Sequence, residues 1–72
     1  MTEERMKEID SMVEQFAKTI PSSGNYLSYL AKVEEMMDRY KQLLALLEED
    51  ETPENKEAMN ILADEIEGII KQ

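Results

Sequence analysis

The apolar residues of the chain recur every three or four positions in three separate segments, which is the spacing of amphipathic α-helices. In the first and third segments they share one side of a helical wheel, and charged residues occupy the other side. The one-sided positions are Met6, Ile9, Met12, Val13, Phe16, Ala17 and Ile20, and then Met59, Leu62, Ala63, Ile66, Ile69 and Ile70. The pattern predicts one domain, residues 1–72, with helices over residues 3–20, 26–49 and 53–70.

Two short interruptions set these boundaries. In the first, Pro21 disfavours helix in the residue before it and Gly24 permits a turn. Ser23 or Asn25 is expected to cap the helix that follows. The second interruption supplies a threonine that can cap a helix and a proline that fits a first helical turn, Thr52 and Pro53.

The middle segment carries the widest apolar surface. A row with alternating spacings of four and three residues resembles a coiled-coil seam and comprises Tyr26, Leu30, Val33, Met37, Tyr40, Leu44 and Leu47. Tyr29, Met36 and Leu43 widen this seam on one flank, so that the apolar arc spans about 140°. Such an arc is broad enough to contact two helices, and we expect the middle helix to be the hub of the fold.

Short connections favour antiparallel packing of consecutive helices. The sequence therefore predicts an all-α fold, an antiparallel three-helix bundle. A helical hairpin with an ancillary N-terminal helix, completed by oligomerisation, is the competing architecture, and the pattern does not separate the two. A chain of 72 residues stabilises a single core only marginally, so association with another chain is an expected remedy.

Composition narrows the function classes. The chain has no cysteine and no histidine, which removes disulfides, thiolate metal sites and histidine-based catalysis. We therefore expect no enzyme, no cofactor and no bound metal. Seventeen acidic and eight basic residues give a net charge of -9, which argues against direct nucleic-acid binding. No segment is apolar enough to span a membrane or to act as a signal peptide, and a cytoplasmic location is expected.

A candidate protein-binding edge lies on the middle helix. Methionine adapts to varied partner shapes, and tyrosine adds contact area with a hydroxyl at the rim. The expected open edge is formed by Tyr29, Met36 and Leu43, with Tyr26, Met37 and Tyr40 beside it. Filling of the core is the plainer interpretation of the same residues.

The densest charge in the chain is an acidic run at the second interruption, Glu48, Glu49, Asp50 and Glu51. A solvated connection explains it simply, and a contact point for a basic partner is the functional alternative. The run lacks the glycine and the ligand spacing of a calcium loop.

These features favour a small acidic, non-catalytic protein-binding module or regulator that acts stoichiometrically through an apolar Tyr/Met/Leu helix face, on another protein or on itself. The leading alternative is an acidic inhibitor that mimics nucleic acid and blocks a nucleic-acid-binding enzyme. A second alternative is sequestration of a small ligand within a helical oligomer.

Overall fold

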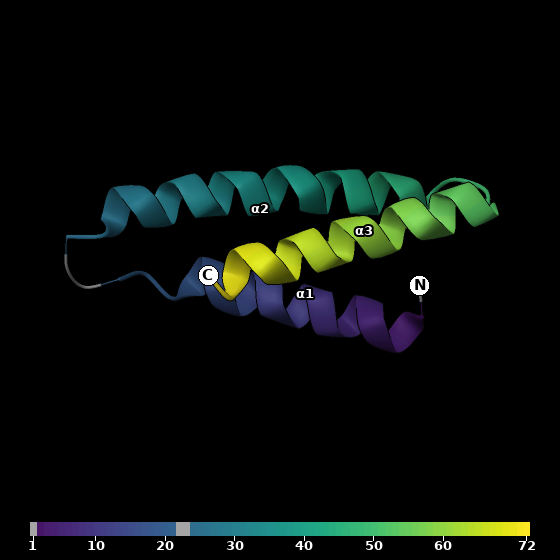
Figure 1. The fold of residues 1–72 in the computed structure, drawn as a ribbon. Helices are drawn as coiled ribbons and strands as arrows, with labels where there is room; N and C mark the ends of the chain where they lie inside the picture. The colour runs from purple at the N-terminus through teal and green to yellow at the C-terminus, as the bar shows by residue number, and fades with distance from the viewer. Residues whose placement is uncertain (1, 22–23) are drawn as a thin grey trace.

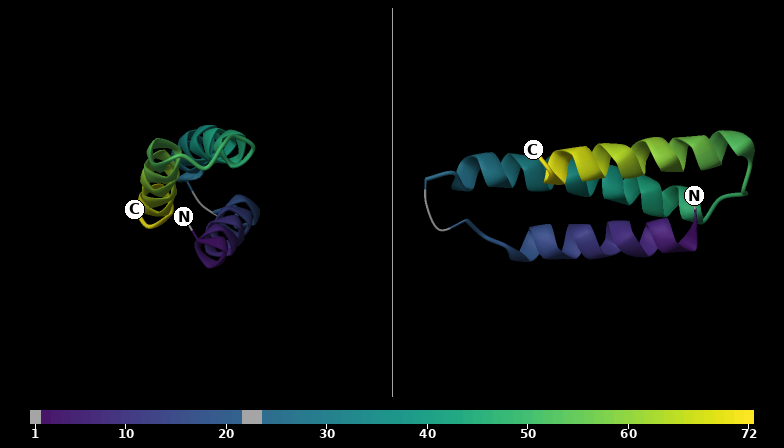
Figure 2. Two further views of the ribbon diagram at one scale, coloured as in Figure 1. Left: turned by 90° about the vertical axis from the view of Figure 1, so that its right-hand side faces the viewer. Right: turned by 60° about the horizontal axis from the view of Figure 1, so that its bottom comes forward.

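The structure, a computed structural model, describes residues 2–21 and 24–72. Three helices, α1 (Glu3–Lys18), α2 (Tyr26–Leu47) and α3 (Pro53–Ile70), run antiparallel to one another in chain order (Figure 1). They form a rod with principal extents of 44 × 19 × 18 Å, and viewed along its axis the helices lie at the corners of a triangle (Figure 2). The predicted all-α antiparallel three-helix bundle is confirmed.

Threonines cap two of the helices. The Thr52 hydroxyl accepts a hydrogen bond from the Asn55 backbone N–H at 3.1 Å, and Pro53 occupies the first position of α3, as the sequence predicts. The Thr2 hydroxyl accepts from the Arg5 N–H at 3.1 Å in the same way. For α2 the cap prediction is wrong at Asn25, whose side chain makes no capping hydrogen bond, and Ser23 lies outside the described residues.

Two helices end earlier than predicted. Helix α1 ends at Lys18 and not at residue 20. Thr19 already leaves the helical conformation, with φ -91° and ψ 85°, and Pro21 disfavours helix at Ile20. Helix α2 ends at Leu47 and not at residue 49. The N–H groups of Glu48 and Glu49 bond back to carbonyls only three residues earlier, which tightens the chain out of the helix.

The core is divided unevenly among the helices. Among the described residues its buried members are Ile9 and Val13 from α1, Met36 and Leu43 from α2, and Met59, Ala63, Ile66 and Ile69 from α3. Contacts are most extensive between α2 and α3, fewer between α1 and α3, and sparsest between α1 and α2. The central helix is therefore α3, and the expectation that the middle helix is the hub is wrong. Both neighbours do contact α2, but unequally.

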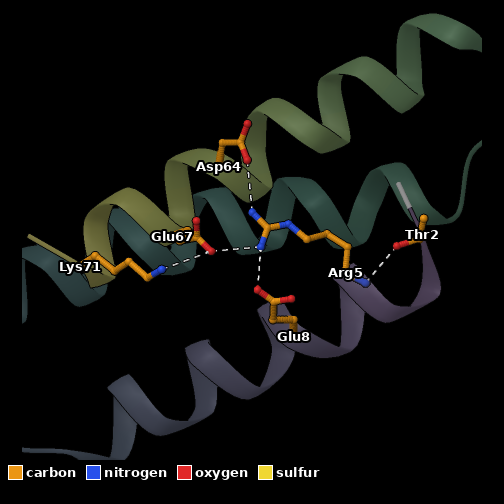
Figure 3. Close-up of polar contacts among 6 residues, drawn as sticks. All are labelled: Thr2, Arg5, Glu8, Asp64, Glu67 and Lys71. Atoms are coloured by element: carbon orange, nitrogen blue, oxygen red, sulfur yellow. Dashed lines mark hydrogen bonds and ion pairs between the residues drawn. The ribbon is translucent and has the colours of Figure 1, made fainter.

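An ion-pair network fastens α1 to α3 (Figure 3). The Arg5 guanidinium donates to Glu8 at 3.0 Å on its own helix, and to Glu67 at 3.1 Å and Asp64 at 3.2 Å on α3. Lys71 lies 3.8 Å from the same Glu67 carboxylate. The hydrogen bond from Arg5 lowers the pKa of Glu67, and the same bond raises the pKa of Arg5.

Candidate functional site

The predicted open edge of α2 is closed in the single chain. Met36 and Leu43 are both 0% exposed and belong to the core. The most extensive contacts of α2 are those with α3. Helix α2 is rotated about its axis so that this flank faces the core of the bundle. Neither residue presents a surface to a partner unless the bundle opens.

Tyr29, the third residue of that edge, attaches α1 to α2. Its hydroxyl lies 2.8 Å from the Phe16 carbonyl oxygen and 2.9 Å from that of Ala17, and its ring centroid lies 5.4 Å from that of Phe16. Carbonyls in the last turn of a helix lack partners within the helix. The tyrosine hydroxyl supplies one, so Tyr29 fixes the C-terminal end of α1.

The remaining predicted residues divide into one structural contact and two surface positions. The half-buried Tyr40 donates a hydrogen bond to the Asp10 carboxylate at 2.5 Å, and this bond, with burial, raises the pKa of Tyr40 to about 12. Tyr26 stacks against Tyr29 at a centroid distance of 6.5 Å and remains exposed. Met37 is half-buried. Of the six, Tyr26 alone is exposed, whereas Tyr29, Met37 and Tyr40 are half-buried.

The acidic run is exposed along its whole length, from Glu48 to Glu51. Its backbone organises the turn before α3, since the Asp50 carbonyl accepts hydrogen bonds from the Thr52 N–H and from the Asn55 side-chain amide, each at 2.8 Å. No group of three or more acidic side chains in the described part of the chain is arranged to hold a metal ion. Contact of this run with a basic partner stays a prediction.

A groove on the outside of the α2–α3 hairpin was not predicted. It has a volume of about 410 Å³ and is lined by Gln42, Ala45 and Leu46 from α2 and by Ala58, Ile61, Leu62 and Glu65 from α3. Ile61 is 52% exposed, although it lies in the middle of a helix. The sequence signal that could have found this outer groove is the pair of alanines, one on each helix, that line it.

Acidic side chains stand at both ends of the outer groove. Asp38, one turn before Gln42, accepts a hydrogen bond from its amide at 3.1 Å, and Glu65 lies at the same end, where Arg39 pairs with it at 2.9 Å. At the other end, next to the α2–α3 turn, Glu49 follows α2 and Glu54 lies in the first turn of α3. The groove is therefore apolar in its middle and has acidic side chains near both ends, of which Glu65 is already paired with Arg39.

A second apolar surface lies along α2 itself. Leu30, Met37 and Leu44 were predicted as part of the core seam, but Leu30 is 38% exposed, Leu44 is 40% exposed and Met37 is half-buried. We refer to these three residues as the Met37 row. The predicted seam is wrong for Leu30 and Leu44, which are exposed, whereas Met37 is partly buried and packs against the core.

Comparison of the chain with protein-family models, with curated proteins and with solved structures found no match. Within residues 2–21 and 24–72, none of the helices combines the length and the apolar character that crossing a membrane requires. Functional inference therefore rests on the two apolar surfaces and on the charges around them.

Proposed function

We propose that this protein is a non-catalytic regulator that binds one helix of a partner protein in the outer groove, and so masks or holds that helix stoichiometrically. The observation that carries this proposal is the apolar groove of about 410 Å³ on the face of the hairpin formed by α2 and α3 alone. We further propose a cytoplasmic setting, since a chain without cysteine suits a reducing compartment.

The lining of the groove suits a helix. Ala45 and Ala58 are small, so a partner backbone can approach closely between the two helices. Ile61 and Leu62 on one side and Leu46 on the other offer apolar area to a partner side chain. Burial of such area contributes roughly 25 cal/mol per Å², and it would be the main driving force for an amphipathic helix to bind here.

The charges at the groove ends favour a basic partner. Asp38 on α2 and Glu49 just after α2 are eleven residues apart, and Glu54 lies at the same end as Glu49. Glu65, at the Asp38 end, is paired with Arg39 of the same chain. A partner helix with apolar residues in its middle and lysine or arginine about three turns apart matches this arrangement. The net charge of -9 adds long-range attraction for such a helix.

Mimicry of nucleic acid is supported less well. Ion pairs with basic side chains of the same chain engage Glu8, Glu14, Asp64, Glu65 and Glu67. These pairs break the rows of negative charge that an enzyme for nucleic acid would recognise.

Titration with a synthetic helix tests the proposal. The probe carries alanine and leucine on one face and lysines eleven residues apart. Its binding is measured by calorimetry against the wild type, Ile61→Lys and Leu27→Lys. We expect Ile61→Lys to weaken binding at least tenfold, because it places a charge in the groove, and Leu27→Lys, at a site 80% exposed and outside the groove, to leave it unchanged.

Two outcomes would overturn the proposal. One is equal affinity of the probe for the wild type and Ile61→Lys. The other is complete loss of binding at high salt in both, which would indicate attraction by the charged exterior without apolar burial.

A further inference from the structure

The Met37 row is symmetric in sequence about Met37, and the lining of the outer groove is not. Leu30 and Leu44 lie seven residues before and seven residues after Met37, so the row reads the same in both directions along α2. Leu27 and Leu47, each ten residues from Met37, are also exposed but lie about 80° to opposite sides of the row. A repeat of seven residues drifts about 20° per repeat on a straight helix, which is the drift of a left-handed coiled-coil seam.

We propose that this protein forms a homodimer in which α2 pairs with α2 of a second copy in antiparallel orientation, with Met37 at the two-fold axis. In this pairing Leu30 lies against the partner's Leu44, and Leu44 lies against the partner's Leu30. The interface is isologous, since the same residues serve both copies, as two-fold dimers require. It covers Leu30 and Leu44, two of the large apolar side chains that α1 and α3 leave exposed on α2.

Charges beside the row select the second copy and the orientation. Glu34 and Lys41 are exposed, lie on the same edge of the row, and form no ion pair within the described residues. Antiparallel pairing about Met37 brings Glu34 next to the partner's Lys41, and symmetry repeats this pair. Parallel two-fold pairing would instead set the edge that carries Glu34 and Lys41 against the opposite edge of the partner helix, so this ion pair would not form.

The other edge of the row is occupied within the chain. Tyr29 and Tyr40 lie there and are hydrogen-bonded to α1. A second α2 therefore has access to the edge that carries Glu34 and Lys41. This inference is independent of the proposed function, because the outer groove lies on residues that the Met37 row does not include.

Cysteine cross-linking tests the register directly, since the natural chain has no cysteine. Under mild oxidation, Met37→Cys is expected to form a covalent dimer. A mixture of Leu30→Cys with Leu44→Cys should cross-link, whereas either alone should not, because antiparallel pairing separates identical positions by fourteen residues, about 21 Å. Ile61→Cys, exposed in the outer groove, is the control for random collision and should give no dimer at the same concentration.

Charge exchange and mass provide the second readout. Light scattering should give twice the mass of a single chain for the wild type. Glu34→Lys should raise the dissociation constant several-fold, and Glu34→Lys combined with Lys41→Glu should restore it, because the exchange rebuilds both ion pairs. Circular dichroism confirms that each variant keeps its helices.

Three results would contradict the inference. A wild type with the mass of one chain at millimolar concentration excludes the dimer. Cross-linking of Leu30→Cys with itself indicates parallel pairing. Cross-linking of Met37→Cys no faster than Ile61→Cys means that the row is not an interface.

Discussion

Met36 and Leu43 have the same side chains and the same seven-residue spacing as their immediate neighbours Met37 and Leu44, yet the bundle encloses only the first pair. Met36 and Leu43 are 0% exposed, whereas Leu44 is 40% exposed and Met37 is half-buried. One residue turns a helix by about 100°, so neighbours of equal chemistry face different surroundings. Apolar character qualifies both pairs for the core, and the rotation of α2 selects between them.

The largest expected difference comes from placing a charge in each pair. Met36→Lys should abolish folding, because an unpaired buried ammonium costs several kcal/mol in a domain whose total stability is about 5–15 kcal/mol. Met37→Lys should retain the helical signal and lose the dimer. Circular dichroism with thermal melting separates the two, and a Met36→Lys variant that melts like the wild type would break the comparison.

A smaller loss is expected where α2 holds α1. Tyr29→Phe removes the hydroxyl that donates to the Phe16 and Ala17 carbonyls, and should reduce the free energy of unfolding by about 0.5–1.5 kcal/mol in urea. Tyr26→Phe is the matched control, since its hydroxyl has no hydrogen-bond partner within the described residues. Equal losses in the two variants would mean that the Tyr29 hydroxyl does not fasten α1.

The Tyr40–Asp10 contact predicts alkaline behaviour. The pKa of Tyr40 is raised from 10.0 to about 12, so the contact of its neutral hydroxyl adds to the free energy of unfolding. This contribution is complete below pH 10 and is lost as pH rises from 10 toward 12. Ultraviolet titration should show a late tyrosinate step that Tyr40→Phe lacks. If wild type and variant finish ionising at the same pH, the contact is not formed in solution.

The smallest effect is expected at the α1–α3 network. Arg5→Ala should lower the melting temperature at neutral pH by a few °C, on the order expected for partly exposed ion pairs. The lowered pKa of Glu67 stabilises the fold at pH values above 4.5, its ordinary pKa. This contribution is lost as pH falls through the pKa of Glu67 in the folded chain. Melts across acidic pH should therefore converge for wild type and Arg5→Ala. A difference that persists in strong acid would assign the effect to packing of the arginine stem.

The helices themselves were predictable because their signals are local. Pro53 and Thr52 fix the start of α3 through backbone geometry and one capping hydrogen bond, and neither depends on the rest of the fold. The same locality explains why α1 and α2 were predicted within two residues of their ends.

The rotation of α2 was not predictable in the same way. An apolar arc of about 140° contains both methionine–leucine pairs, so the pattern permits either to face inward. Which pair faces inward depends on contacts between helices. Among them are the hydrogen bond from the Tyr29 hydroxyl of α2 to the Phe16 carbonyl of α1, and the ion pair of Arg39 on α2 with Glu65 on α3. Spacing along one helix does not encode such partners. The outer groove was missed for the same reason, since its two walls come from different helices.

The most direct test compares Leu43→Ala with Leu44→Ala in urea, at a protein concentration low enough for the single chain to be studied. With Leu43 fully enclosed, its truncation should cost about 2–5 kcal/mol of unfolding free energy, whereas truncation of the half-exposed Leu44 should cost less than about 1 kcal/mol. Equal losses, or a larger loss at Leu44, would show that α2 is rotated differently about its axis, and would contradict the assignment of both its buried face and its binding face.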